Sequence, residues 1–100
     1  MYNKEEILNF IKRFQNEGTI KAFTEGCCYY FAIILISRFC LNESDNLMYH
    51  PIDNHFAVKI NKKLYDITGE IDDNGFEYWS DFLVKDELLT KRIFRDCIDF

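Results

Sequence analysis

The sequence predicts a single α+β domain, in which a central apolar helix packs on a small antiparallel sheet between N- and C-terminal helices. A length of 100 residues suits one domain, and 48% hydrophobic residues exclude a disordered chain. Residues 29–36 are apolar nearly all round, which indicates a buried helix. Residues 55–60 and 63–68 read as two strands joined by a short turn. We therefore expect residues 1–100 to fold as one domain.

The first helix is expected over residues 3–17. Asn3 can cap its start, and Glu5 and Glu6 fall in the first turn, where the helix dipole favours acidic side chains. Apolar residues then recur at the spacing of one helix face: Ile7, Phe10, Ile11 and Phe14. Gly18 is a natural stop for this helix.

The central helix is expected over residues 28–39, and its β-branched isoleucines leave a buried strand as the alternative. Residues 42–46 read as a polar loop, and residues 47–50 as a short strand ended by Pro51. A final helix is expected to begin near Asp86. Its core-facing residues are predicted to be Leu88, Leu89, Ile93 and Phe94.

The hairpin pattern fixes a register for the two central strands. A two-residue turn at Asn61 and Lys62 gives one clean core face, because side chains alternate across a sheet. That face holds Phe56, Val58, Ile60, Tyr65 and Ile67. His55 then faces Thr68, and His55 and Asp66 become diagonal neighbours on the other face. A three-residue turn would place His55 and Asp66 on opposite faces.

Composition narrows the classes of function. The net charge is −5 and no basic run occurs, so direct nucleic-acid binding is not expected, whereas an acidic surface suits a basic protein partner. No apolar run approaches the ~20 residues that span a bilayer. The first residues lack the pattern of a signal peptide. We therefore expect a small acidic domain in the cytoplasm, and the sequence leaves its oligomeric state open.

The four cysteines are Cys27, Cys28, Cys40 and Cys97. A cytoplasmic chain keeps its thiols reduced, so we expect no disulfide. No Cys-x-x-Cys or His-x-x-x-His spacing occurs, so neither a structural zinc nor any other metal or cofactor is expected. Cys40 and Cys97 read as small buried hydrophobic residues.

The chemistry that stands out is a candidate thiol site. A thiolate nucleophile needs a stabilised negative charge, a base to hold its proton, and a group that orients the base. Cys28 lies where the central helix is expected to begin, and a helix N-terminus favours negative charge. His55 is the candidate base and Asp66 the candidate orienting group. His50 is the alternative base, although it is expected at an exposed strand end.

Residues 24–69 carry a resemblance to papain-like cysteine peptidases. Residues 26–32 (Gly-Cys-Cys-Tyr-Tyr-Phe-Ala) resemble the segment in which the nucleophilic cysteine opens a central helix, and they match Cys28 to the nucleophile. Residues 54–58 (Asn-His-Phe-Ala-Val) are similar to the family's Asn-His-Ala-Val strand. Asp66, after Tyr65, resembles the acidic residue of transglutaminase-like and arylamine-acetyltransferase-like members. The stretch also looks like small phage and bacterial proteins with the same succession of motifs.

The resemblance implies a minimal papain-like fold with a Cys28–His55–Asp66 catalytic triad. The implied activity is that of a thiol hydrolase or acyltransferase, such as a peptidase, deamidase or transglutaminase-like enzyme, acting on a peptide, amide or acyl substrate. One departure concerns the oxyanion hole, because the family's glutamine six residues before the cysteine is Ala22 here. Gln15 can replace it only if the first helix bends back.

The alternative function is non-enzymatic. A small acidic domain without low-complexity sequence also suits a phage-type inhibitor that covers a basic surface on a host defence or nucleic-acid enzyme. Rapid labelling of Cys28 that depends on His55 favours the enzyme. Tight partner binding that survives Cys28→Ala favours the inhibitor.

Overall fold

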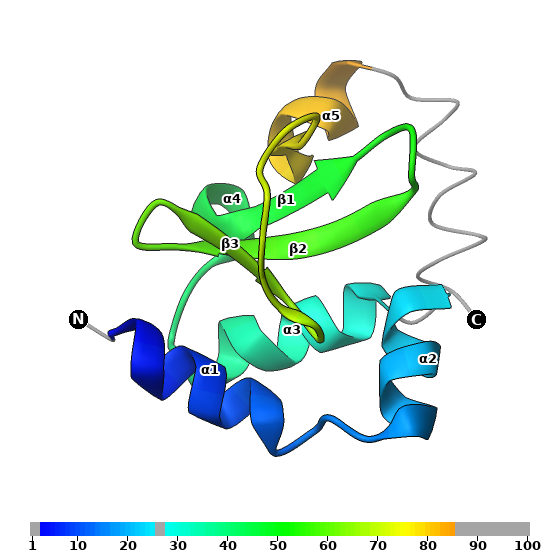
Figure 1. Cartoon of the computed structure of the whole chain (residues 1–100). Coiled ribbons are helices and arrows are strands. Elements are labelled where there is room, and N and C mark those ends of the chain that lie inside the picture. The colour runs from blue at the N-terminus through cyan, green and yellow to red at the C-terminus, as the bar shows by residue number, and fades with distance from the viewer. Residues whose placement is uncertain (1–2, 26–27, 86–100) are drawn as a thin grey trace.

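The computed structural model describes residues 3–25 and 28–85, which form one α+β unit (Figure 1). Its helices are α1 (Lys4–Lys12), α2 (Glu17–Glu25), α3 (Cys28–Arg38), α4 (Glu43–Asn46) and α5 (Trp79–Lys85). Its strands are β1 (Leu47–His50), β2 (His55–Ile60), β3 (Lys63–Asp66), β4 (Gly69–Ile71) and β5 (Glu77–Tyr78). The strands form an antiparallel sheet in the order β4-β3-β2-β1-β5. The predicted fold class is therefore confirmed, while its papain-like character remains an expectation.

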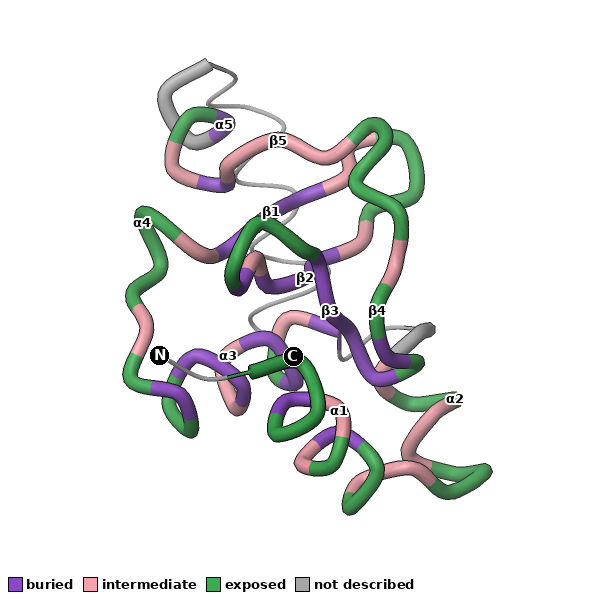
Figure 2. Tube along the Cα trace, turned by 60° about the vertical axis from the view of Figure 1, so that its left-hand side comes forward, coloured by how far each residue is buried: buried purple, intermediate pink, exposed green. Residues whose placement is uncertain are grey.

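The core lies between α3 and the sheet. Helices α1, α2 and α3 lie together below the strands in Figure 1, and α3 packs chiefly on β2. Buried segments of α3, β2 and β3 make up most of this interior (Figure 2). Leu35 and Val58 are completely buried there. Residues 28–38 are helical, so the prediction of a central helix is confirmed and the strand alternative is wrong.

The first helix begins as predicted but ends early. Asn3 caps α1 through a hydrogen bond from the Glu6 N–H at 2.8 Å, and Ile7 and Ile11 are completely buried. The predicted extension to residue 17 is wrong, because α1 ends at Lys12 and a second helix begins at Glu17.

The second helix, α2, was not predicted, and it has a local cause. Asn16 and Thr19 exchange hydrogen bonds between side chains and backbone N–H groups, at 2.9 and 3.0 Å. This reciprocal cap starts a new helix, because it satisfies N–H groups that a helix start leaves unpaired. Gly18 therefore lies in the first turn of α2 instead of ending α1.

The central hairpin has the predicted register. Asn61 and Lys62 form the two-residue turn, with positive φ angles of 52° and 70°, as hairpin turns of this length require. Val58 pairs with Tyr65 on the core side. The second strand is shorter than predicted, because β3 ends at Asp66 and the chain turns at once into β4.

Three other segments differ from expectation or lie outside the described residues. Residues 43–46 form the short helix α4, capped by the Asn42 side chain, where a loop was predicted. Strand β1 over residues 47–50 is confirmed. Helix α5 was not predicted, and the helix expected near Asp86 lies outside the described residues.

Within residues 3–25 and 28–85, no single helix is long and apolar enough to cross a membrane; the α2–α3 pair reaches that length only with a bend of 101°.

Candidate thiol site

Cys28 is the first residue of α3 and is only 4% exposed. The first turn of this helix is held against the start of β2, because the rings of Tyr29 and Phe56 pack edge to face with centroids 5.2 Å apart. Phe56 directly follows His55 in the chain. The packing therefore brings the Cys28 end of α3 to the end of the sheet where His55 lies, and the helix dipole at this end favours a thiolate.

His55 and Asp66 meet as the hairpin register predicts. His55 Nε2 lies 2.8 Å from Asp66 Oδ2, which is the distance of a strong, charge-assisted hydrogen bond. The two side chains are only 17% and 10% exposed, so water screens the pair weakly. The predicted partnership of His55 and Asp66 is therefore present in the structure.

Cys28 interacts with the same imidazole. A hydrogen bond between the Cys28 and His55 side chains is among the interactions that raise the pKa of His55. The three residues that the sequence singled out thus form one chain of contacts in the order thiol, imidazole, carboxylate.

These contacts change the protonation of the site. The pKa of His55 is raised from 6.5 to about 9. The hydrogen bond to Asp66 is the largest cause and the hydrogen bond to Cys28 the second, and together they outweigh burial, which lowers the pKa. His55 is therefore an imidazolium at neutral pH. Burial alone would raise the pKa of Asp66, but hydrogen bonds from His55 and Thr68 outweigh it and lower that pKa. The stable form near pH 7 is a carboxylate beside an imidazolium.

Thr68 belongs to the site although the sequence analysis placed it in a strand facing His55. The chain turns before Thr68 can pair with His55, and its backbone N–H donates to Asp66 Oδ1 at 2.8 Å. The Thr68 hydroxyl donates to the same oxygen. The signal available in the sequence was Asp66-Ile67-Thr68-Gly69, because Asp at the first position and Gly at the fourth are typical of a type I turn.

His50 lies beside the site but has a different set of contacts. It pairs with His55 across β1 and β2, and its Nδ1 accepts a hydrogen bond from the Asp53 N–H at 3.1 Å. Its ring packs edge to face on Phe76, with centroids 5.1 Å apart. The His50 side chain is only 14% exposed, so the expectation of an exposed strand end is wrong. Because Asp66 binds His55, His55 is the better candidate base.

The structure also places the two residues considered for the oxyanion hole. Ala22 lies on an exposed face of α2 and has no polar side-chain atom to contribute. Helix α1 ends at Lys12, before Gln15, and the Gln15 amide donates to the Ile67 carbonyl at 2.7 Å, one residue from Asp66. Gln15 therefore contacts the turn that carries Asp66, and no contact places its amide at Cys28.

Cys28 and Cys40 are free thiols. Cys40 is exposed, so the prediction that it is a small buried residue is wrong, while Cys27 and Cys97 lie outside the described residues. Within the described ranges no group of three His, Cys, Asp or Glu side chains could hold a metal ion.

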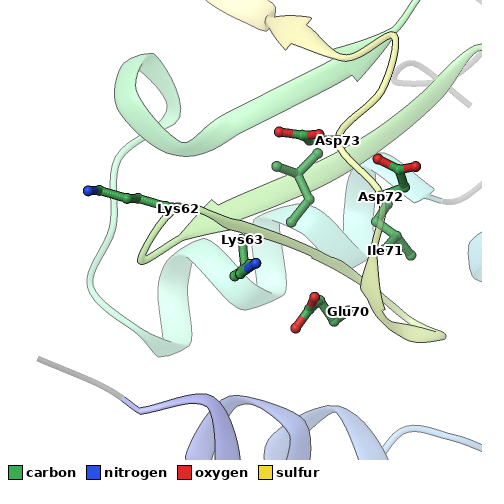
Figure 3. A pocket seen from close by; sticks show the side chains of 7 residues that line it. Lys62, Lys63, Glu70, Ile71, Asp72 and Asp73 are labelled. Atoms are coloured by element: carbon green, nitrogen blue, oxygen red, sulfur yellow. The ribbon is translucent and has the colours of Figure 1, made fainter.

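A shallow pocket lies between the β2–β3 turn and β4 (Figure 3). It is lined by Lys62, Lys63, Leu64, Glu70, Ile71, Asp72 and Asp73, and it includes none of the three site residues.

Comparison with known proteins assigns the chain to a family. A family model described as Phage YunG-like protein matches residues 7–95. The chain belongs to the phage YunG-like family. No curated protein and no solved structure matches it. The family match supports the expected phage character and covers Cys28, His55 and Asp66, but its description names no reaction.

Proposed function

We propose that this member of the phage YunG-like family is a cysteine-dependent hydrolase or acyltransferase that acts on a peptide, amide or acyl substrate. The observation that carries the proposal is the unbroken line of contacts from Cys28 through His55 to Asp66. His55 interacts with both the thiol and the carboxylate, as nucleophilic thiol catalysis needs. The helix N-terminus at Cys28 adds a favourable environment for negative charge.

The protonation of His55 suits the first half of such a reaction. In the reactive thiolate–imidazolium pair the proton is already on His55, and the Cys28 thiolate forms a C–S bond to the substrate carbonyl carbon as the carbonyl π electrons move onto its oxygen. As the tetrahedral intermediate collapses, the C–N or C–O bond breaks, and the imidazolium gives its proton to the leaving nitrogen or oxygen. A pKa of about 9 keeps that proton on His55 until the leaving group needs it, which matters most for a poor leaving group such as an amine.

The second half of the reaction returns the enzyme to its starting state. Neutral His55 takes a proton from water, or from an acceptor amine or alcohol, as that oxygen or nitrogen attacks the thioester carbon. The C–S bond breaks, and the thiolate–imidazolium pair forms again. Water as acceptor gives hydrolysis and an amine or alcohol gives acyl transfer. Asp66 stays ionised throughout and holds the imidazole in place, which its lowered pKa supports.

The test is to trap the thioester. Whole-protein mass spectrometry after brief exposure to p-nitrophenyl acetate should detect one acetyl group, and peptide mapping should locate it on Cys28. Cys28→Ala and His55→Ala should abolish it, whereas the matched control Cys40→Ser should retain it, because Cys40 is exposed and outside the site. Acetylation spread over several cysteines, or undiminished in His55→Ala, would contradict the proposal. The non-enzymatic inhibitor would then become the leading function.

A further inference from the structure

The Asp66 carboxylate is held from two sides, and each side uses a different oxygen. His55 engages Oδ2, while both hydrogen bonds from Thr68 converge on Oδ1. The bond from the Thr68 N–H to a side chain two residues earlier is an Asx turn, which fixes the rotamer of the aspartate. Because one oxygen is anchored in this way, the other is aimed at the imidazole.

The turn that contains Thr68 is itself held in place. Asp66 pairs with Gly69, so Ile67 and Thr68 occupy the two central positions of the turn between β3 and β4. Gly69 has a φ of +112°, a conformation that residues with a side chain rarely adopt. The Gln15 amide, 52 residues earlier in the chain, donates to the Ile67 carbonyl at 2.7 Å. The junction between α1 and α2 is thus tied to the residue next to Asp66.

We propose that Thr68 is a positioning residue that aims Asp66 at His55, and that Gln15 supports it by holding the Ile67–Thr68 turn. Neither residue needs to touch the substrate in this role. Thr68 is exposed, whereas Asp66 and Ile67 are buried. Substitutions of exposed residues usually change stability little, so a substitution at Thr68 that changes the protonation of the partly buried His55 points to this specific role.

The proposal rests on the proposed function, and its first readout is independent of any reaction. Thr68→Val keeps the shape of the side chain and removes the hydroxyl. We expect it to lower the pKa of His55 by about half a unit or more, roughly a threefold change in the protonation equilibrium. Thr68→Ser, which keeps the hydroxyl, should retain most of the wild-type pKa of His55. Nuclear magnetic resonance titration of the imidazole signal measures the pKa of His55 in the wild type and in both variants.

The second readout is the rate at which iodoacetamide alkylates Cys28 at neutral pH. Thr68→Val should slow this reaction severalfold but less than Asp66→Asn does, and Gln15→Leu should have a smaller effect in the same direction. Lys62→Ala is the control, because it changes an exposed turn residue at the other end of β3. It should leave both the pKa of His55 and the alkylation rate unchanged.

The outcomes separate failure of this inference from failure of the proposed function. If Asp66→Asn lowers both quantities but Thr68→Val behaves like wild type, Thr68 is no positioning residue and the inference is overturned. If Thr68→Val lowers the pKa of His55 while Cys28 reacts like an ordinary thiol in every variant, the positioning role stands and the enzymatic proposal fails. Equal losses in Thr68→Val and Thr68→Ser would also overturn the inference, since the hydroxyl would not be the cause.

Discussion

Replacing Asp66 by Asn removes the charge that His55 faces while keeping an oxygen that can accept from Thr68. In the wild type the pKa of His55 rises from 6.5 to about 9; the hydrogen bond with Asp66 is the largest single cause, and the one with Cys28 is the second. One pKa unit corresponds to about 1.4 kcal/mol, so the surroundings favour the imidazolium by about 3 kcal/mol in total. A neighbouring opposite charge shifts a pKa by roughly 1–3 units, so Asp66→Asn should lower that of His55 by about 1–2 units.

The assay is a nuclear magnetic resonance titration of the imidazole signals from about pH 5 to pH 10, across the usual histidine range. The chain has only two histidines, so His50→Gln assigns them and His50 serves as an internal reference. Cys28→Ala should lower the pKa of His55 by less than Asp66→Asn does. A wild-type pKa near 6.5, or a larger fall in Cys28→Ala than in Asp66→Asn, would refute this account of the site.

Three further predictions concern stability, each measured by urea unfolding. Because the pKa of Asp66 is lowered in the folded state, this carboxylate stabilises the fold above its usual pKa of about 4, and the stabilisation is lost as the pH falls below that value. Asp66→Asn should therefore weaken the loss of stability at acid pH. An unchanged loss in the variant would contradict the prediction. Lys62→Gly should raise the free energy of unfolding by about 0.5–1 kcal/mol, since Lys62 has a φ of 70°, and a loss would count against the turn geometry. Cys40→Gly should stabilise by a similar ~1 kcal/mol, because Cys40 has a φ of 55° at the end of α3; destabilisation would argue against this cap.

The sequence was sufficient to predict the parts of the fold that depend on simple periodicity. The apolar run after Cys28 became α3, and the alternation around Asn61 and Lys62 set the register that joins His55 to Asp66. A one-residue slip would have moved the apolar side chains of one strand to the opposite face, so a clean apolar face fixes the register strongly. The partnership of two candidate site residues therefore followed from local pattern.

The errors arose where side chains bind nearby backbone. The reciprocal bonds of Asn16 and Thr19 start α2 at Glu17, so Gly18, which was interpreted as a helix stop, lies in its first turn. Similarly, the Asn42 side chain caps the short helix α4 in what was expected to be a loop. Such caps depend on the conformation of a few residues, which composition and hydrophobic periodicity do not reveal.

Other errors needed three-dimensional information. Cys40 is an exposed residue in the left-handed conformation at the end of α3, where the Leu41 N–H donates to the Ile36 carbonyl at 2.9 Å. A cysteine at a helix end cannot be distinguished by its type from one in the core. Likewise, the bond from Gln15 to Ile67 joins residues 52 positions apart, so only the folded chain brings it to light.

The most direct test of the central claim is the pH dependence of iodoacetamide alkylation at Cys28, compared with Cys40 in the same molecule. Cys28 is 4% exposed and Cys40 is exposed, so access alone favours Cys40. If His55 and Asp66 stabilise a thiolate, Cys28 should nevertheless react faster at about pH 7, and His55→Ala should remove that advantage. If Cys28 reacts slowly at about pH 7 and accelerates only above about pH 8.5, where an ordinary thiol ionises, it is a buried structural thiol and the catalytic account is wrong.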